Sequence, residues 1–140
     1  MKGVDSIEIQ KVNADDLMDI RHVVLWPDKP REFIKVPEDE SGTHFGLYFD
    51  GAIVSAISLF PDGLNIRFRK FATLPGFQGK GLGSKLLQHA IIHAQNQGFV
   101  RMWCDARTDA LRFYERFGFT KFSEPFFKEH LEYYKIERML

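Results

Sequence analysis

A short run rich in glycine stands between a stretch with strand-like alternation and a stretch with helical spacing. Residues 78–84 read Gln-Gly-Lys-Gly-Leu-Gly-Ser, and leucines and alanines follow at intervals of three or four. The first N–H groups of a helix have no intrahelical partner and carry the positive end of the helix dipole. Glycines let a ligand come close to such a backbone. The segment therefore predicts a strand–loop–helix unit that holds a phosphate.

Two common phosphate loops fit this segment poorly. A Walker A loop needs Lys and then Ser or Thr directly after Gly81, where the chain has Leu82 and Gly83. A dinucleotide-binding fingerprint needs a third glycine where Ser84 stands. Asp105 does lie about where a ribose-binding acid would, so a small nucleotide-binding oxidoreductase stays open as an alternative.

The remaining pattern predicts an α/β fold with a mixed, mostly antiparallel sheet flanked by helices. Strands are expected at 7–12, 45–49, 52–59, 65–73, 99–106, 119–122 and 133–139, and helices at 13–25, 82–94 and 108–117. Asp50-Gly51 favours a hairpin turn, residues 61–63 another turn, and 27–43 an irregular insert. Residues 1–140 are expected to form a single domain.

Composition excludes several classes of protein. Of the 140 residues 44% are hydrophobic, which suffices for one core, and 19 basic residues balance 19 acidic ones. This balance disfavours binding to nucleic acid or to a membrane surface. The single cysteine, Cys104, cannot form an internal disulfide, residues 1–10 lack a signal-peptide core, and no run of about 18 apolar residues occurs. A cytoplasmic protein is expected.

Two motifs resemble those of one enzyme family. Gln78, Gly81 and Gly83 fit Gln/Arg-x-x-Gly-x-Gly/Ala, the acetyl-CoA-binding motif of the GCN5-related N-acetyltransferase superfamily. Downstream, the chain is similar to that family's Ala, Phe-Tyr, Gly-Phe signature, through Ala110, Phe113, Tyr114, Glu115, Gly118 and Phe119. One departure is Arg107, which stands where the family often has Asn.

The resemblance implies direct transfer of an acetyl group from acetyl-CoA, the cosubstrate, to an amine, without a metal. The backbone of Gln78, Gly79, Lys80, Gly81, Leu82, Gly83 and Ser84 would hold the pyrophosphate. A bulged strand that splays from its neighbour would admit the pantetheine arm along Phe71, Ala72 and Thr73, with an N–H near Thr73 polarising the thioester. Tyr114 would protonate the leaving sulfur, and Lys80, Arg107 and Arg116 would meet phosphates.

A general base cannot be chosen from the sequence. Glu32, His44, Asp105 and Glu124 could each take a proton from an ammonium group, and none is preferred. His89 and His93 lie one helical turn apart without an evident third ligand, so a solvated helix face is expected instead of a metal site. Cys104 is expected to pack within its strand.

The resemblance implies that the acceptor is an amine of a small molecule or a peptide, and the sequence leaves its character open. Arg67 and Arg69 project opposite to Ile66 and Phe68, with Lys70 beside them. These cations either line the acceptor cleft and favour an acidic acceptor, or face solvent. The aromatic pairs Phe126, Phe127, Tyr133 and Tyr134 are expected first in sheet packing, then in a pocket wall or a homodimer face. A CoA-binding sensor without turnover is the alternative function.

Overall fold

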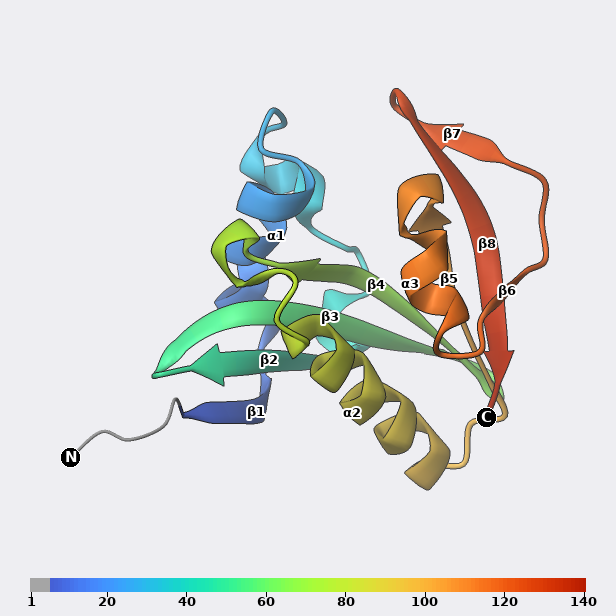
Figure 1. The fold of residues 1–140 in the computed structure, drawn as a ribbon, viewed down its shortest axis with the longest axis horizontal. Coiled ribbons are helices and arrows are strands. Elements are labelled where there is room, and N and C mark those ends of the chain that lie inside the picture. Colours follow the sequence, from blue (N-terminus) through green and yellow to red (C-terminus); the bar gives the residue numbers. More distant parts are fainter. Residues whose placement is uncertain (1–5) are drawn as a thin grey trace.

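The computed structural model describes residues 6–140 and contains one eight-stranded sheet with helices on both faces (Figure 1). Residues 1–5, part of the stretch considered above for a signal peptide, lie outside the described residues. The strands are β1 Ile7–Val12, β2 Thr43–Phe49, β3 Ala52–Asp62, β4 Asn65–Thr73, β5 Arg101–Arg107, β6 Thr120–Lys121, β7 Phe126–Lys128 and β8 Leu131–Met139. The α-helices are α1 Met18–Leu25, α2 Leu82–Asn96 and α3 Leu111–Glu115.

The sheet is mixed and mostly antiparallel, as the sequence predicts. Its order is β1-β2-β3-β4-β5-β8-β6, and β7 pairs with β8. The pairing of β4 with β5 is parallel, and the other pairs among residues 6–140 are antiparallel. The helix α2 supplies the crossover between the two parallel strands, as a parallel connection requires.

Four details differ from the sequence-based expectations. Residues 61 and 62 continue β3 instead of forming a turn, which proline tolerates because β3 extends past its last β2 partner, Leu59. The strand expected at 99–106 begins at Arg101, and the helix expected at 108–117 is the short 3₁₀ turn Thr108–Ala110 followed by α3. The sequence pattern indicates no strand at β7, which has only three residues, too few to show the alternation typical of a strand.

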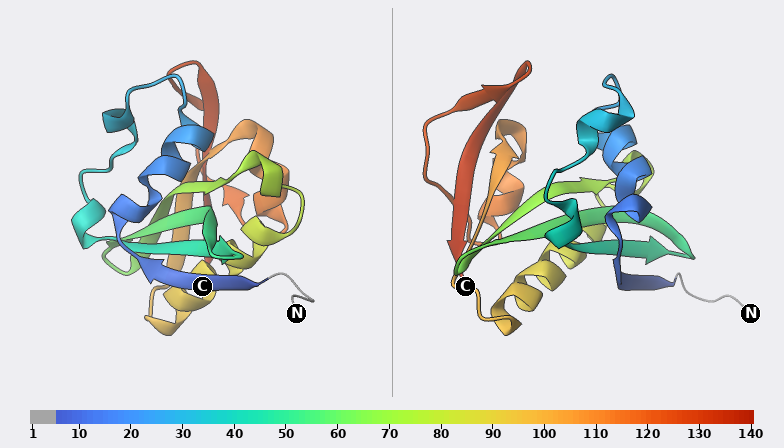
Figure 2. Two further views of the ribbon diagram at one scale, coloured as in Figure 1. Left: turned by 90° about the vertical axis from the view of Figure 1, so that its left-hand side faces the viewer. Right: turned by 180° about the vertical axis from the view of Figure 1, so that it is seen from behind.

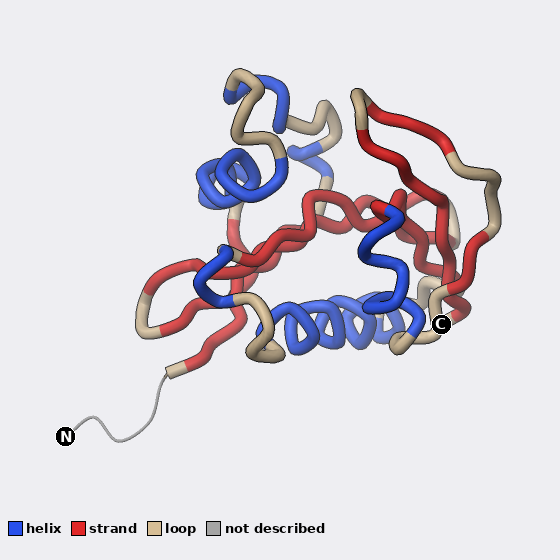
Figure 3. Tube along the Cα trace, turned by 45° about the horizontal axis from the view of Figure 1, so that its top comes forward, coloured by secondary structure: helices blue, strands red, loops and turns tan. Residues whose placement is uncertain are grey.

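Helices cover both faces of the sheet (Figure 3). The buried face of α2, with Leu86, Leu87 and Ile91, packs in one core with residues of the central strands and α3. Leu17 and Ile20, from the region of α1, pack on the other face against Ala56 and Ala72. The central strands are thus buried on both faces, and this fixes their register.

A bulge in β4 changes which face its side chains occupy. Lys70 and Phe71 of β4 stand opposite Ile57 alone on β3, and Lys70 has a positive φ of 56°. Strict alternation would put Phe68 and Phe71 on opposite faces of the sheet. With the extra residue both rings lie on the same face, with centroids 6.1 Å apart.

The pairing between β4 and β5 is short, and the two strands then separate. Their parallel register covers residues 65–67 of β4 and 101–103 of β5. Beyond it, β4 stays with β3 while β5 stays with β8, so the sheet opens into two arms (Figure 2). The splayed, bulged strand inferred from the family resemblance is therefore present.

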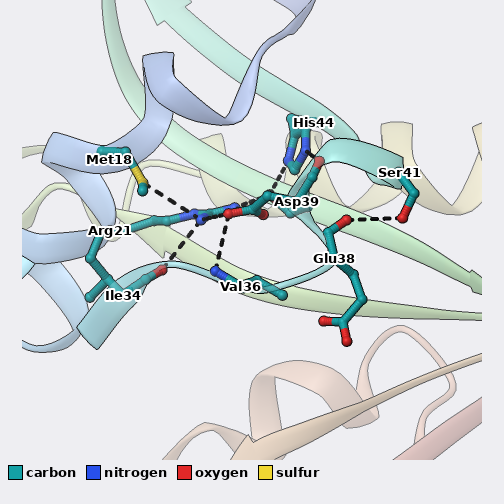
Figure 4. A network of polar contacts seen from close by, with 9 residues as sticks. Met18, Arg21, Ile34, Val36, Glu38, Asp39, Ser41 and His44 are labelled. Atoms are coloured by element: carbon teal, nitrogen blue, oxygen red, sulfur yellow. Dashed lines mark hydrogen bonds and ion pairs between the residues drawn. The ribbon is translucent and has the colours of Figure 1, made fainter. Parts of the chain in front are cut away.

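A buried arginine anchors the irregular segment between α1 and β2. The guanidinium of Arg21 is fully buried and donates to both carboxylate oxygens of Asp39, each at 2.9 Å, and to Ser58 Oγ at 2.9 Å (Figure 4). It also donates to the carbonyl of Ile34 at 3.3 Å. This segment contributes Trp26, among others, to one wall of the cleft described below.

His44 completes this network. Its Nε2 lies 2.8 Å from the carbonyl oxygen of Asp39, which can only accept, so Nε2 carries a proton. Its Nδ1 lies 2.7 Å from Ser58 Oγ. Both ring nitrogens are thus engaged inside the fold, where the residue is 4% exposed.

The charge state of Asp39 links this anchor to pH. Burial alone would raise the pKa of Asp39, but hydrogen bonds from Arg21 and the N–H of Val36, with the charge of Arg21, hold it below its ordinary value. A lowered folded-state pKa stabilises the fold above the unfolded-state value of about 3.9. That stabilisation is lost as the pH falls through the folded-state pKa.

Replacing Asp39 by Asn should cost about 3 kcal/mol of unfolding free energy at pH 7, because it leaves Arg21 buried without its counter-charge. Urea denaturation measures this loss, and the gap between the two proteins should narrow below about pH 4. The exposed Glu40→Gln is the control and should stay within about 0.5 kcal/mol of the unchanged protein. A gap of the same size at pH 7 and pH 3 would contradict the assignment.

Candidate active site

A cleft of about 1150 Å³ lies where β4 and β5 separate. Its walls come from β4, the start of α2 with its preceding loop, the far half of β5, α3, the end of α1 and β7. The cleft thus brings together segments from both sequence motifs. It also draws in residues near position 26 and position 128, which neither motif includes.

The edge of β4 that faces β5 is unpaired along the cleft. Ala72 and Thr73 pair with Ala56 and Ser55 of β3, while no residue of β5 beyond position 103 pairs with β4. In an extended strand, backbone groups alternate between the two edges, so part of the N–H and C=O groups of 71–73 point into the opening. Phe71, Ala72 and Thr73 line the cleft, and the cofactor contact expected of them stays a prediction.

The glycine loop presents free N–H groups at the start of α2. The first hydrogen bond of the helix runs from the N–H of Lys85 to the carbonyl of Gly81 at 3.1 Å, which leaves the preceding N–H groups without intrahelical acceptors. Gly79 and Gly81 have φ of 75° and 79° and open space where a Cβ would stand. Gln78, Gly79, Gly81, Gly83 and Ser84 line the cleft.

Two residues of the glycine loop, Lys80 and Leu82, do not line the cleft with their side chains. Leu82 is 3% exposed in the core, so only its backbone can meet a ligand, and Lys80 is exposed and does not line the cleft. The loop is held to β4 because Gln78 Nε2 donates to the carbonyl of Thr73 at 2.8 Å. A Cβ on Gly83 would lie 3.2 Å from Thr73 Oγ1 and 3.5 Å from Phe71 Cζ, so this position needs a small residue.

Tyr114 lies on α3 with its ring packed among aromatic residues and borders the cleft. The ring contacts Phe68, Phe71 and Phe119 at centroid distances of 5.8, 6.3 and 5.9 Å. Burial raises the pKa of Tyr114 well above its usual value, so the hydroxyl keeps its proton at neutral pH. Within residues 6–140 no side chain or backbone group is hydrogen-bonded to this hydroxyl, which leaves the proton free for a ligand.

A cluster of charges around Asp105 of β5 borders the cleft. The carboxylate of Asp105, 6% exposed, accepts from Arg67 at 2.7 Å, Lys128 at 2.9 Å and Lys135 at 2.9 Å. Burial alone would raise the pKa of Asp105, but these hydrogen bonds and charges lower it. Asp105 is therefore occupied by cations, which leaves it unsuited to hold a ribose or to act as a base.

The family model for the "Acetyltransferase (GNAT) family" matches residues 12–119 of the chain. The chain belongs to the GNAT family. A relative, the "Uncharacterized N-acetyltransferase YitI" of Bacillus subtilis (strain 168), is 30% identical over 94% of this chain and 97% of its own length. The chain is accordingly an N-acetyltransferase whose acyl donor is a CoA thioester.

Solved structures share the GNAT fold. A GNAT family acetyltransferase from Elizabethkingia anophelis with acetyl-CoA bound superposes with a TM-score of 0.79 at 19% identity, covering 96% of this chain and 98% of that one. A Bacillus subtilis acetyltransferase in complex with CoA gives a TM-score of 0.74 at 17% identity, covering 98% and 99%. Each resemblance extends over nearly the whole chain. It therefore includes the N-terminal part, which contains neither of the two sequence motifs.

None of the four candidate bases is placed for catalysis in this GNAT fold. His44 is held in the Arg21 network, and Asp105 is paired with three cations. Glu32 and Glu124 are exposed and do not line the cleft. The acceptor amine must therefore lose its proton by another route.

Arg107 spans the opening from β5 to α1. Its Nη2 donates to the carbonyl of Leu25 at 2.9 Å, and its guanidinium lies over the ring of Trp26 at 5.5 Å. Its Nε also donates to Tyr133 Oη at 3.4 Å. Residue 107 lines the cleft, but these contacts direct its side chain toward α1, and the cofactor contact inferred from the family remains a prediction.

Three further candidates from the sequence, Cys104, His89 and His93, contribute to packing. Cys104 is buried, and burial raises its thiol pKa, so it packs as predicted. His89 and His93 are half-buried with their rings against Phe45, at 4.8 and 5.2 Å, instead of forming a merely solvated face. Burial and the charge of His89 lower the pKa of His93. In the part of the chain that is described, no group of three or more His, Cys, Asp or Glu residues could hold a metal.

The C-terminal aromatic residues mainly support the sheet. Phe126 stacks on Tyr133 at 5.9 Å, and Tyr133 also lines the cleft, while Phe127 is 65% exposed. Arg116 lines the cleft with its guanidinium over Phe113 at 5.6 Å. No helix within residues 6–140 is long and apolar enough to span a membrane.

Proposed function

We propose that residues 1–140 form a single N-acetyltransferase domain that binds acetyl-CoA in the opening between β4 and β5. The observation that carries this proposal is the unpaired edge of β4 leading directly into the free N–H groups of the glycine loop. In this arrangement the pantetheine arm extends along Phe71, Ala72 and Thr73 as an additional strand. The pyrophosphate rests on the backbone of 78–84.

The acetyl group passes directly to the acceptor amine. The nitrogen lone pair attacks the thioester carbonyl carbon, and an N–H near Thr73 stabilises the negative charge that develops on the oxygen. The carbon–sulfur bond then breaks, and the leaving sulfur takes the proton of the Tyr114 hydroxyl. The nitrogen loses its surplus proton to water, and Tyr114 regains a proton from water before the next turnover. None of these steps uses a metal ion.

Composition and the site support the partners and compartment that we infer. The chain has no net charge, which favours a small-molecule or peptide amine over nucleic acid or a membrane. A free, buried Cys104 suits the reducing cytoplasm. The homodimer stays a prediction, with the exposed Phe127 as its contact.

Gly83→Val should weaken acetyl-CoA binding at least about tenfold, because its side chain would push Phe71 and Thr73 toward the pantetheine path. Titration calorimetry measures the affinity, and thermal unfolding checks that the variant is folded. Gly76→Val is the matched control, since a Cβ there meets nothing within 4 Å and residue 76 lies outside the cleft. Equal affinities for the two folded variants would place the cofactor elsewhere.

Tyr114→Phe should lower kcat by about 10² while leaving acetyl-CoA affinity nearly unchanged, because only the proton donor is lost and the ring still packs. CoA-thiol release with a responsive amine measures kcat, and Tyr134→Phe, which removes a hydroxyl outside the cleft, is the control. Wild-type turnover by Tyr114→Phe from neutral to alkaline pH would show that another group protonates the sulfur.

A further inference from the structure

Two cations in the cleft lack a counter-ion. Arg69 and Lys70 line the cleft on β4 and are half-buried. Within residues 6–140 neither side chain makes a hydrogen bond, an ion pair or a ring contact. The guanidinium of Arg69 presents several N–H donors in a fixed plane, and because the residue is only half-buried these donors are open to a ligand. Such a residue is well suited to a bound anion.

The acidic residues of the cleft do not neutralise these cations. Asp105 is already shared by Arg67, Lys128 and Lys135, so that group of four keeps a surplus of positive charge. Glu129 lines the cleft but pairs with Lys29 at 2.6 Å. Asp109 also lines it, from the turn before α3, while Lys35 adds another cation from the opposite wall.

The ionisation of Lys70 reflects this surplus. Burial, followed by the charges of Arg69, Arg21 and Lys128, lowers the pKa of Lys70 to about 8. Burial and the charge of Arg67 likewise lower the pKa of Arg69, and the charges of Asp105 and Glu38 offset this only in part. A group that brought negative charge into this part of the cleft would relieve both effects.

The position of the two cations separates them from the donor site. Arg69 belongs to the face of β4 opposite Phe68, whereas Phe68 packs against Tyr114 in the core on the α2 and α3 side. Along the chain, Arg69 and Lys70 precede residues 71–73, and the pyrophosphate loop follows them. The cations thus lie on the far side of the proposed thioester from the pyrophosphate, where an acceptor would enter.

We propose that the acceptor is an amine that also carries a carboxylate or phosphate group, and that Arg69 and Lys70 bind this anion. The inference rests on the proposed function of the same cleft. A guanidinium can bind either anion through two parallel N–H bonds, and the ammonium adds a point charge beside it. Polyamines and other purely cationic amines are then poor acceptors, because the wall of the cleft repels them.

The test compares amines that differ only in the anion. 4-Aminobutyrate is paired with its neutral amide, 4-aminobutanamide, and glucosamine 6-phosphate with glucosamine, while spermidine represents cationic amines. Release of the CoA thiol from acetyl-CoA gives kcat/KM for each amine. We expect the anionic member of at least one pair to be preferred by about tenfold or more, and the preferred pair identifies carboxylate or phosphate.

Arg69→Gln should remove this preference, mainly through a higher KM for the anionic amine, and leave the neutral partner within about twofold. Lys70→Gln should act in the same direction. Arg112→Gln, an exposed arginine of α3 outside the cleft, is the control and should keep the preference. Thermal unfolding verifies folding, which should persist because Arg69 holds no other residue in place.

Several outcomes would overturn the inference in different ways. If neutral or cationic amines are acetylated as well as the anionic ones, or if Arg69→Gln slows both members of a pair equally, the anion site is wrong while the acetyltransferase activity stands. If acetyl-CoA binds and no amine of the panel is acetylated, the anion site is wrong; if acetyl-CoA does not bind at all, the proposed function of the cleft fails, and the acceptor site fails with it.

Discussion

The separation of β4 from β5 is the constraint on which the rest of the site depends. Parallel pairing ends after Arg67 and Trp103, and each strand then follows its antiparallel partner. The opening leaves backbone groups of β4 unpaired, which a folded protein avoids unless a ligand or water satisfies them. The bulge at Lys70 and Phe71 acts at the same place, since it brings Phe71 to the side of Tyr114 and leaves Arg69 on the other. One distortion of a strand therefore separates the proposed donor side of the cleft from the proposed acceptor side.

Positive charge distinguishes the part of the cleft that carries Arg69 and Lys70. The buried ion pair of Arg21 and Asp39 anchors the segment between α1 and β2, which forms one wall of the cleft. The two charges of this pair neutralise each other. The charges left at the cleft are mostly positive. Burial and neighbouring cations lower the pKa of Lys70 to about 8, and a bound acceptor amine would experience the same cations. These cations give this part of the cleft the positive character on which the proposed anion site rests.

The sequence predicted the parts of this site that depend on local chemistry. The glycine loop, the start of α2 and the Asp50-Gly51 turn follow from backbone freedom, which can be read from single residues. A motif pointed to Tyr114, which does border the cleft, while its role as proton donor stays a prediction. The contacts of Arg107 with Leu25 and Trp26 could not be predicted, because they join residues far apart in the chain and depend on how the two arms of the sheet separate. The role of His44 was hidden for the same reason, since its partners Ser58 and Asp39 come from different segments.

Backbone amide hydrogen exchange with and without CoA tests the central claim most directly, since it reports on the N–H groups themselves. The account predicts that exchange slows at residues 71–73 and across 79–84 when CoA binds, while amides of β1, away from the cleft, keep their rates. Protection confined to other segments, with unchanged exchange at both of these, would contradict the placement of the cofactor between β4 and β5.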